Sequence, residues 1–394
     1  MPAEPTARYL DNHATTRTDP RVVESMLPFF SERFGNAAST GHAFGDDAAA
    51  AVETARAEVA ELLGAEPVEV IFTSGATEAN NLALKGVLGT SPTNAHLVVS
   101  TVEHPSILDP AARLQRDGCQ LTRIPCDADG RIDPETVISA LTPDTVLVSV
   151  MWANNEVGTI NPVIDCAQAC HDRGVIFHTD AVQAAGRVPV NCRNLAVDLL
   201  SLSAHKIYGP KGIGALIVRR GTRRIRLAPQ IEGGGHEGHL RSGTLPVPLV
   251  IGFGTACRLA REALESESNR LSGLAGTLVE GIRSRLPGVR INGHATDRLP
   301  GNVHLGFEGV DGDALLAGLR QIAVSSGSAC TTANPEPSHV LAAMGVPEAL
   351  SRASLRFGLG RFNTEEDIAV AVEEVVTTVE RLRGVDNSPR PTVR

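Results

Sequence analysis

The sequence lacks any run of about 20 consecutive apolar residues, the length that a helix needs to cross a bilayer. Its first ten residues also lack the basic start and the apolar stretch of a secretory signal peptide. Both absences argue against a membrane or secreted protein. We therefore expect a cytoplasmic chain that does not bind membranes.

Cysteine is sparse, with seven residues among 394 and no CxxC pair. Disulfide frameworks and structural zinc sites need denser, regularly spaced sets. The segment His236-Glu237-Gly238-His239 does not have the HExxH spacing of a zinc-binding helix. We expect free thiols in a reducing compartment and no metal site.

Positive charge is in deficit, because 36 Lys and Arg face 45 Asp and Glu, for a net charge of -9. Such a field repels phosphate backbones, so direct nucleic-acid binding is disfavoured. One local exception is a group of five arginines, Arg219, Arg220, Arg223, Arg224 and Arg226. A solvated hairpin is the favoured interpretation of this group, ahead of a docking surface for an acidic acceptor protein or a tRNA-associated partner.

The rest of the composition, 42% hydrophobic and 21% charged, is that of a globular protein with a large core. From Asp19 to about Gly221, short Val- and Ile-rich runs alternate with helical stretches, a pattern typical of an α/β unit on a mostly parallel sheet. The expected strands are residues 68–72, 96–100, 120–124, 146–151, 175–178, 199–202 and 215–219.

A smaller α+β domain is expected to follow. Residues 245–286 form a long helical pattern, short strands are expected at 289–292 and 302–307, and a closing helix at about 364–382. We therefore predict a large domain over residues 19–250, a small domain over 1–18 and 251–385, and a flexible tail over 386–394.

The first chemical motif is the segment from Thr73 to Glu78, which joins an expected strand to an expected helix. Its glycine allows a tight turn, and the free N–H groups of a helix start suit a phosphate. An ordinary helix cap would have the same residues. Neither GxGxxG nor a P-loop follows a strand here, so this is not a dinucleotide or Walker motif.

Two further residues complete a constellation. Asp180 ends an expected strand, and Lys206 follows the next strand along the chain, 206 − 180 = 26 residues later. A lysine beside a buried acid fits a Schiff-base lysine opposite a pyridinium nitrogen. The turn, the acid and the lysine together predict a pyridoxal 5'-phosphate site.

The ordered motifs resemble those of the class V aminotransferases and, within them, the cysteine desulfurases of the NifS and IscS type. The likeness runs from about Tyr9 to about Ile368. The segments that carry it are LDNHATT (10–16), FGN (34–36), TSGATEANN (73–81), NNEVG (154–158), DAVQ (180–183), SAHKIYGPKGIG (203–214), RSGTLP (241–246) and SSGSACT (325–331). The resemblance implies a fold-type I pyridoxal phosphate enzyme, with a mostly parallel seven-stranded sheet in the large domain, and a homodimer whose active site lies near the subunit interface.

The resemblance also implies roles for individual residues. Lys206 would hold the cofactor, Asp180 would bind its pyridinium nitrogen, and Gln183 its phenolic oxygen. His104 would stack on the ring and transfer protons, although without the resemblance a histidine with satisfied hydrogen bonds is the plainer interpretation. The residues implied at the phosphate are Ala76, Thr77, Ser203, His205 and, from the other subunit, Thr244.

The substrate would lie beside Asn155, Arg356 and Asn36, with Asn155 also at the cofactor. Arg356 would bind the carboxylate of the amino acid, a task that suits a guanidinium fork, whereas its plain alternative is a surface ion pair.

Cys330 decides the reaction. It lies among Ser, Gly, Ala and Thr residues that favour an exposed thiol, while the other six cysteines have ordinary core or surface positions. The resemblance implies that Cys330 takes sulfur from L-cysteine as a persulfide, releases L-alanine and passes the sulfur to an acceptor protein. That acceptor could serve iron–sulfur cluster assembly, tRNA thiolation or a dedicated pathway.

Other activities stay open. A selenocysteine lyase or another class V aminotransferase would use the same cofactor residues, although a transaminase needs no loop thiol. A catalytically idle scaffold is disfavoured, because Lys206, Asp180 and Cys330 are all present. The C-terminal residues 387–394 lack the Trp-His-His type of ending with which some family members dock the iron–sulfur scaffold, so the acceptor is open.

Overall fold

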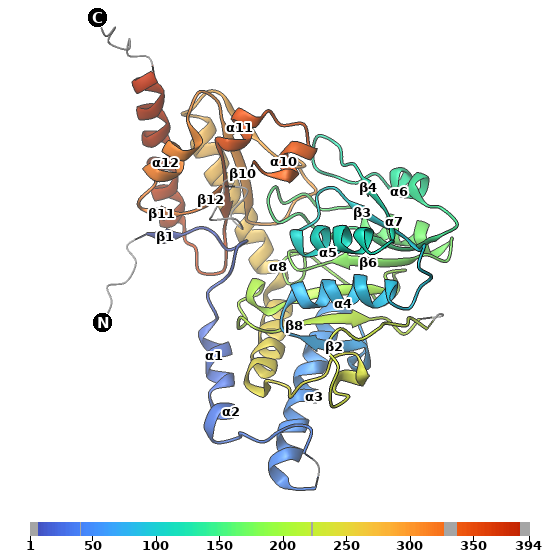
Figure 1. The fold of residues 1–394 in the computed structure, drawn as a ribbon. Helices are drawn as coiled ribbons and strands as arrows, with labels where there is room; N and C mark the ends of the chain where they lie inside the picture. The colour runs from blue at the N-terminus through green and yellow to red at the C-terminus, as the bar shows by residue number, and fades with distance from the viewer. Residues whose placement is uncertain (1–6, 40, 222–223, 327–336, 387–394) are drawn as a thin grey trace, which may run out of the picture.

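The protein is described by a computed structural model over residues 7–39, 41–221, 224–326 and 337–386. A seven-stranded sheet with helices on both faces forms its larger part, and a smaller set of strands and helices packs at one end of a long helix, α8 (Figure 1). This arrangement confirms the expected α/β class with a smaller α+β part.

The large sheet has the order β2-β8-β7-β6-β5-β3-β4. Its neighbours pair in parallel, except that β8 is antiparallel to both β2 and β7. The strands are β2 (Val70–Thr73), β3 (His96–Ser100), β4 (Gln120–Ile124), β5 (Thr145–Ser149), β6 (Ile176–Asp180), β7 (Leu199–Ser203) and β8 (Gly214–Val218). The prediction of a mostly parallel seven-stranded sheet is confirmed.

Both faces of this sheet are covered, as continuous apolar strands require. On one face, α4 (Ala76–Leu88) and α5 (Pro105–Arg116) pack against residues such as Ile71, Leu97 and Leu216. On the other face, α3 (Ala43–Leu63), α6 (Pro134–Ala140), α7 (Val163–His171) and the first half of α8 (Val247–Arg283) pack against Phe72, Val98 and Phe177.

Local sequence signals set several helix ends. Asp19 and Asp133 cap α1 (Pro20–Met26) and α6 with their side chains, and a proline follows each cap. Gly64 ends α3 with a φ of 65°, a conformation that glycine adopts at little cost. The short helix α2 (Pro28–Ser31) also begins at a proline.

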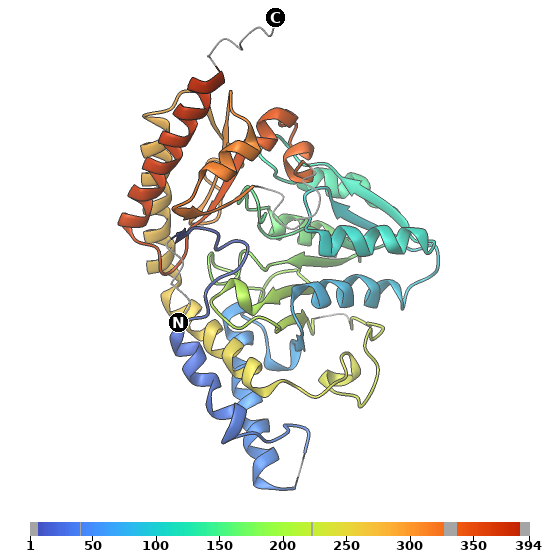
Figure 2. The same cartoon turned by 60° about the vertical axis from the view of Figure 1, so that its left-hand side comes forward.

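The smaller part contains the antiparallel sheet β12-β13-β10-β9 and the pair β1-β11. Its strands are β1 (Arg8–Tyr9), β9 (Val289–Ile291), β10 (Asn302–Phe307), β11 (Ile322–Ala323), β12 (Ser325–Ser326) and β13 (Ser354–Gly358), and its helices are α9 (Gly312–Gly318), α10 (His339–Ala343), α11 (Glu348–Arg352) and α12 (Glu365–Asp386). Figure 2 shows α12 alongside the second half of α8.

Helix α8 joins the two parts. Residues Val250 to Ala260 of α8 lie in the core of the large sheet, and Leu271 to Ile282 lie in the core formed with β10, β13 and α12. The helix runs without a break through residue 250, where we placed the boundary between the predicted domains. The division of the chain into those two domains stays a prediction.

The strands expected at 146–151, 175–178 and 215–219 are shifted or changed at their ends by one or two residues. Two other differences have a clear physical cause. The strand expected at 68–72 begins at Val70, because residues Pro67–Glu69 form the 3-10 turn η1, in which Glu69 bonds back to the N–H of Glu66. Arg219 does not extend into solvent as a hairpin residue would, since it forms a 2.6 Å ion pair with the buried Glu69. Arg223 lies outside the described residues.

Candidate active site

The predicted cofactor residues meet where β2, β6 and β7 end. Asp180 is the last residue of β6, and Lys206 lies in the 3-10 turn η2 (Ala204–Lys206) directly after β7. Strands β6 and β7 are neighbours, with Asp180 in register with Ser201. Ligands of open α/β sheets bind at this carboxyl edge.

Asp180 is almost fully buried, with 5% of its surface exposed. Its Oδ1 accepts from the N–H of Val182 at 3.0 Å, and its Oδ2 accepts from Asn80 Nδ2 at 2.8 Å. Among the described residues no Lys or Arg forms an ion pair with it. A buried carboxylate without a cationic partner is costly, so this position calls for a positively charged ligand group.

The N-terminal segment closes over Lys206. Lys206 Nζ donates to the carbonyl oxygens of His13 and Ala14, at 2.5 and 2.8 Å. Gln183 Nε2 donates to the same His13 carbonyl, and Gln183 Oε1 accepts from Arg187 at 2.6 Å. The predicted cofactor residues Lys206 and Gln183 are thus brought together by the backbone of His13.

His13 is a site residue that the sequence did not single out. Its ring is fully buried, its Nδ1 lies 3.0 Å from Gln183 Oε1, and its Nε2 has no partner among the described residues. Burial, then the charges of Arg187 and Arg356, holds the pKa of His13 well below its ordinary value. Its only signal in the sequence was its place in the LDNHATT segment.

His104 caps the start of α5, where its Nδ1 accepts from the N–H of Ser106 at 3.1 Å. Burial lowers the pKa of His104, the charge of Asp180 raises it, and the charge of Lys206 lowers it further. These influences place the imidazole within electrostatic reach of both cofactor residues and favour its neutral form.

The expected phosphate turn has the predicted form. Helix α4 begins at Ala76 directly after Gly75, so the N–H groups of its first turn, including that of Thr77, have no partner within the helix. A Cβ placed on Gly75 would come 3.9 Å from Ser203 Oγ, so the Ser203 hydroxyl faces this turn. His205 Nδ1 contacts Thr15 Oγ1, and burial, then Lys206, lowers the pKa of His205 to about 4.

Arg356 is not a surface residue. It is 3% exposed, and its guanidinium donates to Asp11 Oδ1 at 2.9 Å and to the backbone oxygen of Asn155 at 2.9 Å. Its Nε is buried without a partner among the described residues. The geometry therefore brings together Arg356 and Asn155, the two residues predicted to bind the substrate carboxylate.

Three predicted residues are not part of this assembly. Asn36 and Thr244 are exposed, and within the described part of the chain no hydrogen bond joins either to the site. Cys330 lies outside the described residues. The six other cysteines are buried or half-buried, and burial raises the pKa of each thiol whose shift is resolved, to about 12 for Cys166.

The site fits pyridoxal phosphate. Among the described residues the carboxylate of Asp180 has no cationic partner, which a pyridinium nitrogen would supply, and Lys206 can form an imine. The helix start after Gly75 suits the phosphate.

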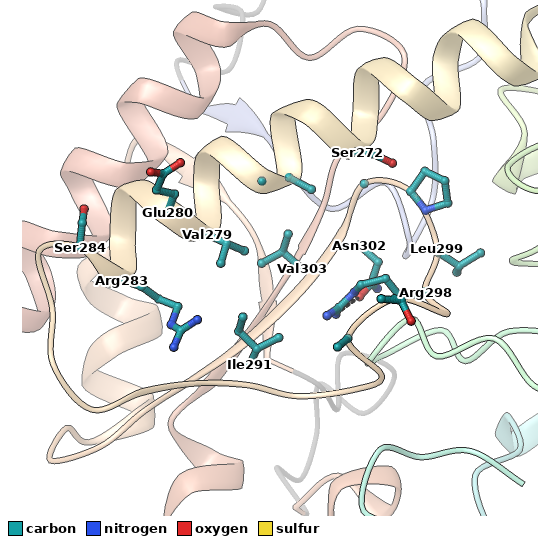
Figure 3. Close-up of a pocket in the computed structure, with 16 residues that line it drawn as sticks. Ser272, Val279, Glu280, Arg283, Ser284, Ile291, Arg298, Leu299, Asn302 and Val303 are labelled. Atoms are coloured by element: carbon teal, nitrogen blue, oxygen red, sulfur yellow. Dashed lines mark hydrogen bonds between the residues drawn. The ribbon is translucent and has the colours of Figure 1, made fainter.

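A groove of about 680 Å³ lies elsewhere, between the second half of α8 and the segment from β9 to β10 (Figure 3). Val279, Ile291 and Val303 line its apolar centre, and Arg283 and Arg298 approach it from the sides. None of the predicted cofactor or substrate residues lines it. Volume alone therefore does not locate the site.

The His236–His239 segment is bonded to α3 and β2 through Glu237. Glu237 accepts from Arg56 at 2.8 and 2.9 Å and from the N–H of Phe72 at 2.7 Å. It lies in the turn η3 (Glu237–His239).

In the described part of the chain, no helix has both the length and the apolar character for a bilayer crossing.

Comparison with known proteins places the chain. Residues 8–370 match the family model described as aminotransferase class-V. The chain is 49% identical over 376 residues to the cysteine desulfurase IscS of Anaeromyxobacter dehalogenans (strain 2CP-C). These residues cover 95% of this chain and 93% of that protein.

Two solved structures are also similar. A NifS-like protein matches with a TM-score of 0.89 and 35% identity, covering 95% of this chain and all of that chain. A structure described as SspA in complex with cysteine matches with a TM-score of 0.80 and 35% identity, covering 91% of this chain and all of that one. Enzymes of this family and fold depend in general on pyridoxal phosphate. This chain belongs to the class V aminotransferase family, in the branch of the cysteine desulfurases.

Proposed function

We propose that the protein is a cysteine desulfurase that converts L-cysteine to L-alanine and leaves a persulfide on Cys330. The observation that carries the proposal is the buried carboxylate of Asp180, which has no ion pair among the described residues and ends the strand next to the one that Lys206 follows, on a chain 49% identical to a cysteine desulfurase. A relative that is 35% identical has been solved with cysteine, which supports this amino acid as the substrate.

Pyridoxal phosphate, when bound, supplies an electron sink for the carbanion that forms when the amino acid loses its Cα proton. Asp180 would favour the protonated form of the ring nitrogen, because it offers a negative partner in a buried setting. Lys206 would hold the cofactor through its amino group, and the same amino group could carry a proton. The carbonyls of His13 and Ala14 hold Lys206 Nζ at the site in the meantime.

Arg356 and Asn155 orient the substrate. The Arg356 guanidinium is held between Asp11 and the Asn155 backbone. These bonds fix the orientation of its planar group before a substrate binds. A substrate carboxylate can share this guanidinium with Asp11, or take the place of Asp11. His104, kept neutral by burial, offers one ring nitrogen for proton transfer.

The sulfur step balances with no outside oxidant. The Cys330 thiolate attacks the substrate sulfur, the S–S bond forms, and the C–S bond breaks with its electron pair moving to the substrate Cβ. Protonation of that carbon and return of a proton to Cα give L-alanine, so L-cysteine and an enzyme thiol become L-alanine and an enzyme persulfide. The persulfide then passes its outer sulfur to an acceptor protein in the cytoplasm.

A homodimer is part of the proposal. Thr244 is exposed and has no hydrogen bond to the cofactor residues of its own chain among the described residues, as expected of a group that serves the phosphate of a second subunit. Asn36, which is also exposed, is assigned to the substrate.

The test is alanine formation from L-cysteine by the cofactor-loaded protein, with a thiol reductant present. We expect alanine and sulfide in equal amounts, and no alanine from Cys330→Ala. Cys126→Ala is the matched control, because the half-buried Cys126 has a raised pKa and should not matter. Alanine formation by Cys330→Ala would overturn the role of Cys330. Alanine from selenocysteine but not from cysteine would favour a selenocysteine lyase instead.

A further inference from the structure

A chain of hydrogen bonds connects Asp180 with His104 through two residues to which the sequence assigned no role. Asn80, on α4, places its Nδ2 at 2.8 Å from Asp180 Oδ2 and at 2.8 Å from Ser106 Oγ. Ser106, on α5, places its Oγ at 2.8 Å and its backbone N at 3.1 Å from His104 Nδ1. Asn80 is fully buried and Ser106 is 8% exposed, so water does not replace these bonds.

The direction of each bond follows from the carboxylate at one end. A carboxylate only accepts, so Asn80 must turn its NH2 group toward Asp180. The second hydrogen of this NH2 group then goes to Ser106 Oγ. Asn80 Oδ1 is buried with no partner among the described residues, so this side chain contributes through its two donor hydrogens.

The serine passes this direction on to the histidine. Because Ser106 Oγ accepts from Asn80, its own proton is available for His104 Nδ1. The backbone N–H of Ser106 points at the same nitrogen. A nitrogen that faces two donors cannot carry a proton, so the proton of the neutral imidazole lies on Nε2.

We propose that Asn80 and Ser106 are positioning residues that hold His104 in the Nε2–H tautomer and align its ring with the Asp180 carboxylate. The proposal rests on the proposed function, in which His104 and Asp180 serve one cofactor. Nδ1 is occupied by Ser106, so the group that His104 presents to the reacting groups is its Nε2–H, a hydrogen-bond donor.

Several groups besides the Asn80–Ser106 hydrogen bonds influence whether the His104 ring is protonated. Asp180 on β6 and Asp109 on α5 favour the protonated ring, whereas Lys206 in η2 and His339 on α10 oppose it. Burial opposes it most. The two donors of Ser106 act with burial, because protonation of Nδ1 would place three N–H or O–H hydrogens against one another.

The test uses the holoenzyme labelled with 15N-histidine, because NMR distinguishes protonated from unprotonated ring nitrogens. The spectrum of His104→Gln identifies the His104 signals among those of the 12 histidines. We expect an unprotonated Nδ1 and a protonated Nε2 in the wild type over the neutral pH range. A protonated Nδ1 there would overturn the proposal, whatever the variants do.

The variants test the role of each partner. Ser106→Ala removes one of the two donors, so we expect the apparent pKa of His104 to rise by roughly 0.5 to 1 unit, the effect of one hydrogen bond. Ser106→Thr keeps a hydroxyl and should return the pKa to the wild-type value. Ser91→Ala, which removes a hydroxyl bonded to Val87 at the end of α4, should leave the pKa unchanged.

Asn80→Ala frees the Ser106 hydroxyl to rotate, and we expect a smaller rise of the His104 pKa. Asn81→Ala is the matched control, since the half-buried Asn81 on the same helix bonds only to Thr77 among the described residues. Equal His104 titrations in Ser106→Ala, Ser106→Thr and the wild type would contradict the proposal. The readout needs no substrate, so a wild-type enzyme that makes no alanine would overturn the proposed function and leave this inference standing.

Discussion

Arg356 and Asp11 form a buried ion pair, with Nη2 of Arg356 2.9 Å from Oδ1 of Asp11. The two residues are 345 positions apart, and only 4% and 17% of their side chains are exposed. The pair fixes the N-terminal segment, whose carbonyls hold Lys206, against the strand that presents the proposed carboxylate-binding guanidinium.

Replacement of Arg356 by lysine tests the proposed substrate contact. Arg356→Lys keeps the charge but loses the planar fork, so a bidentate contact to a carboxylate is lost. We expect the KM for L-cysteine to rise by about 10- to 100-fold, the effect of one charged hydrogen bond, with a smaller change in kcat. Arg352→Lys, two positions before β13 and half exposed, is the control and should change neither constant. A fall in kcat with unchanged KM would contradict the assignment.

Gly214 tests the phosphate turn. It lies on β8 between Thr73 of β2 and Ser203 of β7, and a Cβ at Gly214 would meet Leu202 O at 2.4 Å and the backbone of Gly75 at 2.8 Å. Gly214→Ala must therefore displace the turn that begins α4. We expect the affinity of the apo protein for pyridoxal phosphate to fall at least tenfold, measured by fluorescence titration.

Gly221→Ala is the matched control for this change. A Cβ at Gly221 would meet nothing within 4 Å. Gly221 is exposed and lies three residues after the end of β8, the strand that contains Gly214. Its cofactor affinity should equal that of the wild type. Equal affinities of both variants would show that the turn after β2 does not bind the cofactor.

Glu103 predicts a pH dependence of stability. Burial, with a smaller contribution from the charge of Asp180, raises the pKa of its carboxyl to about 8, while hydrogen bonds from Ser100 and the N–H of Met151 oppose the shift. Between about pH 4.5 and 8 the folded protein holds a proton here that the unfolded chain has lost. The free energy of unfolding therefore falls as pH rises through this range, by at most about 1.4 kcal/mol per pH unit.

Glu103→Gln removes this titration and keeps an oxygen for both hydrogen bonds. We expect its urea midpoint, relative to that of the wild type, to increase steadily from pH 5 to pH 8. Glu135→Gln, at an exposed position on α6, is the control and should show no such trend. Parallel pH profiles for Glu103→Gln and the wild type would contradict the buried neutral acid.

Mixed dimers test the role proposed for Thr244. Lys206→Ala and Thr244→Ala chains should each have little activity alone. If Thr244 serves the partner's cofactor, a dimer of one chain of each kind has one site with both residues intact, and we expect that site to recover activity. Differently tagged chains, refolded together and purified for both tags, allow the measurement. If no activity is recovered, Thr244 acts on the cofactor site of its own chain.

Much of the fold follows from local sequence. The expected limits of β3, β4 and β10 agree with the structure at both ends. Short apolar runs bounded by turn residues leave little choice for where a strand begins and ends. Asp19, Asp133 and Gly64 set helix ends through their own side chains or backbone. The extra turn at Pro67–Glu69 was missed, although Pro67 and the bond from the Glu66 N–H to Glu69 are local signals for it. The contact of Glu69 with Arg219, 150 residues away, is visible only in the tertiary structure.

The sequence by itself determined the elements and the chemistry of the residues: a mostly parallel α/β sheet, a lysine and an acid at strand ends, and a thiol at Cys330. Only the tertiary structure decided which side chains meet. The Asp180–Asn80–Ser106–His104 chain joins one strand to two helices, and Arg356 meets Asp11 across nearly the whole chain. Such contacts depend on strand order and on the packing of distant segments, which no local pattern of residues specifies.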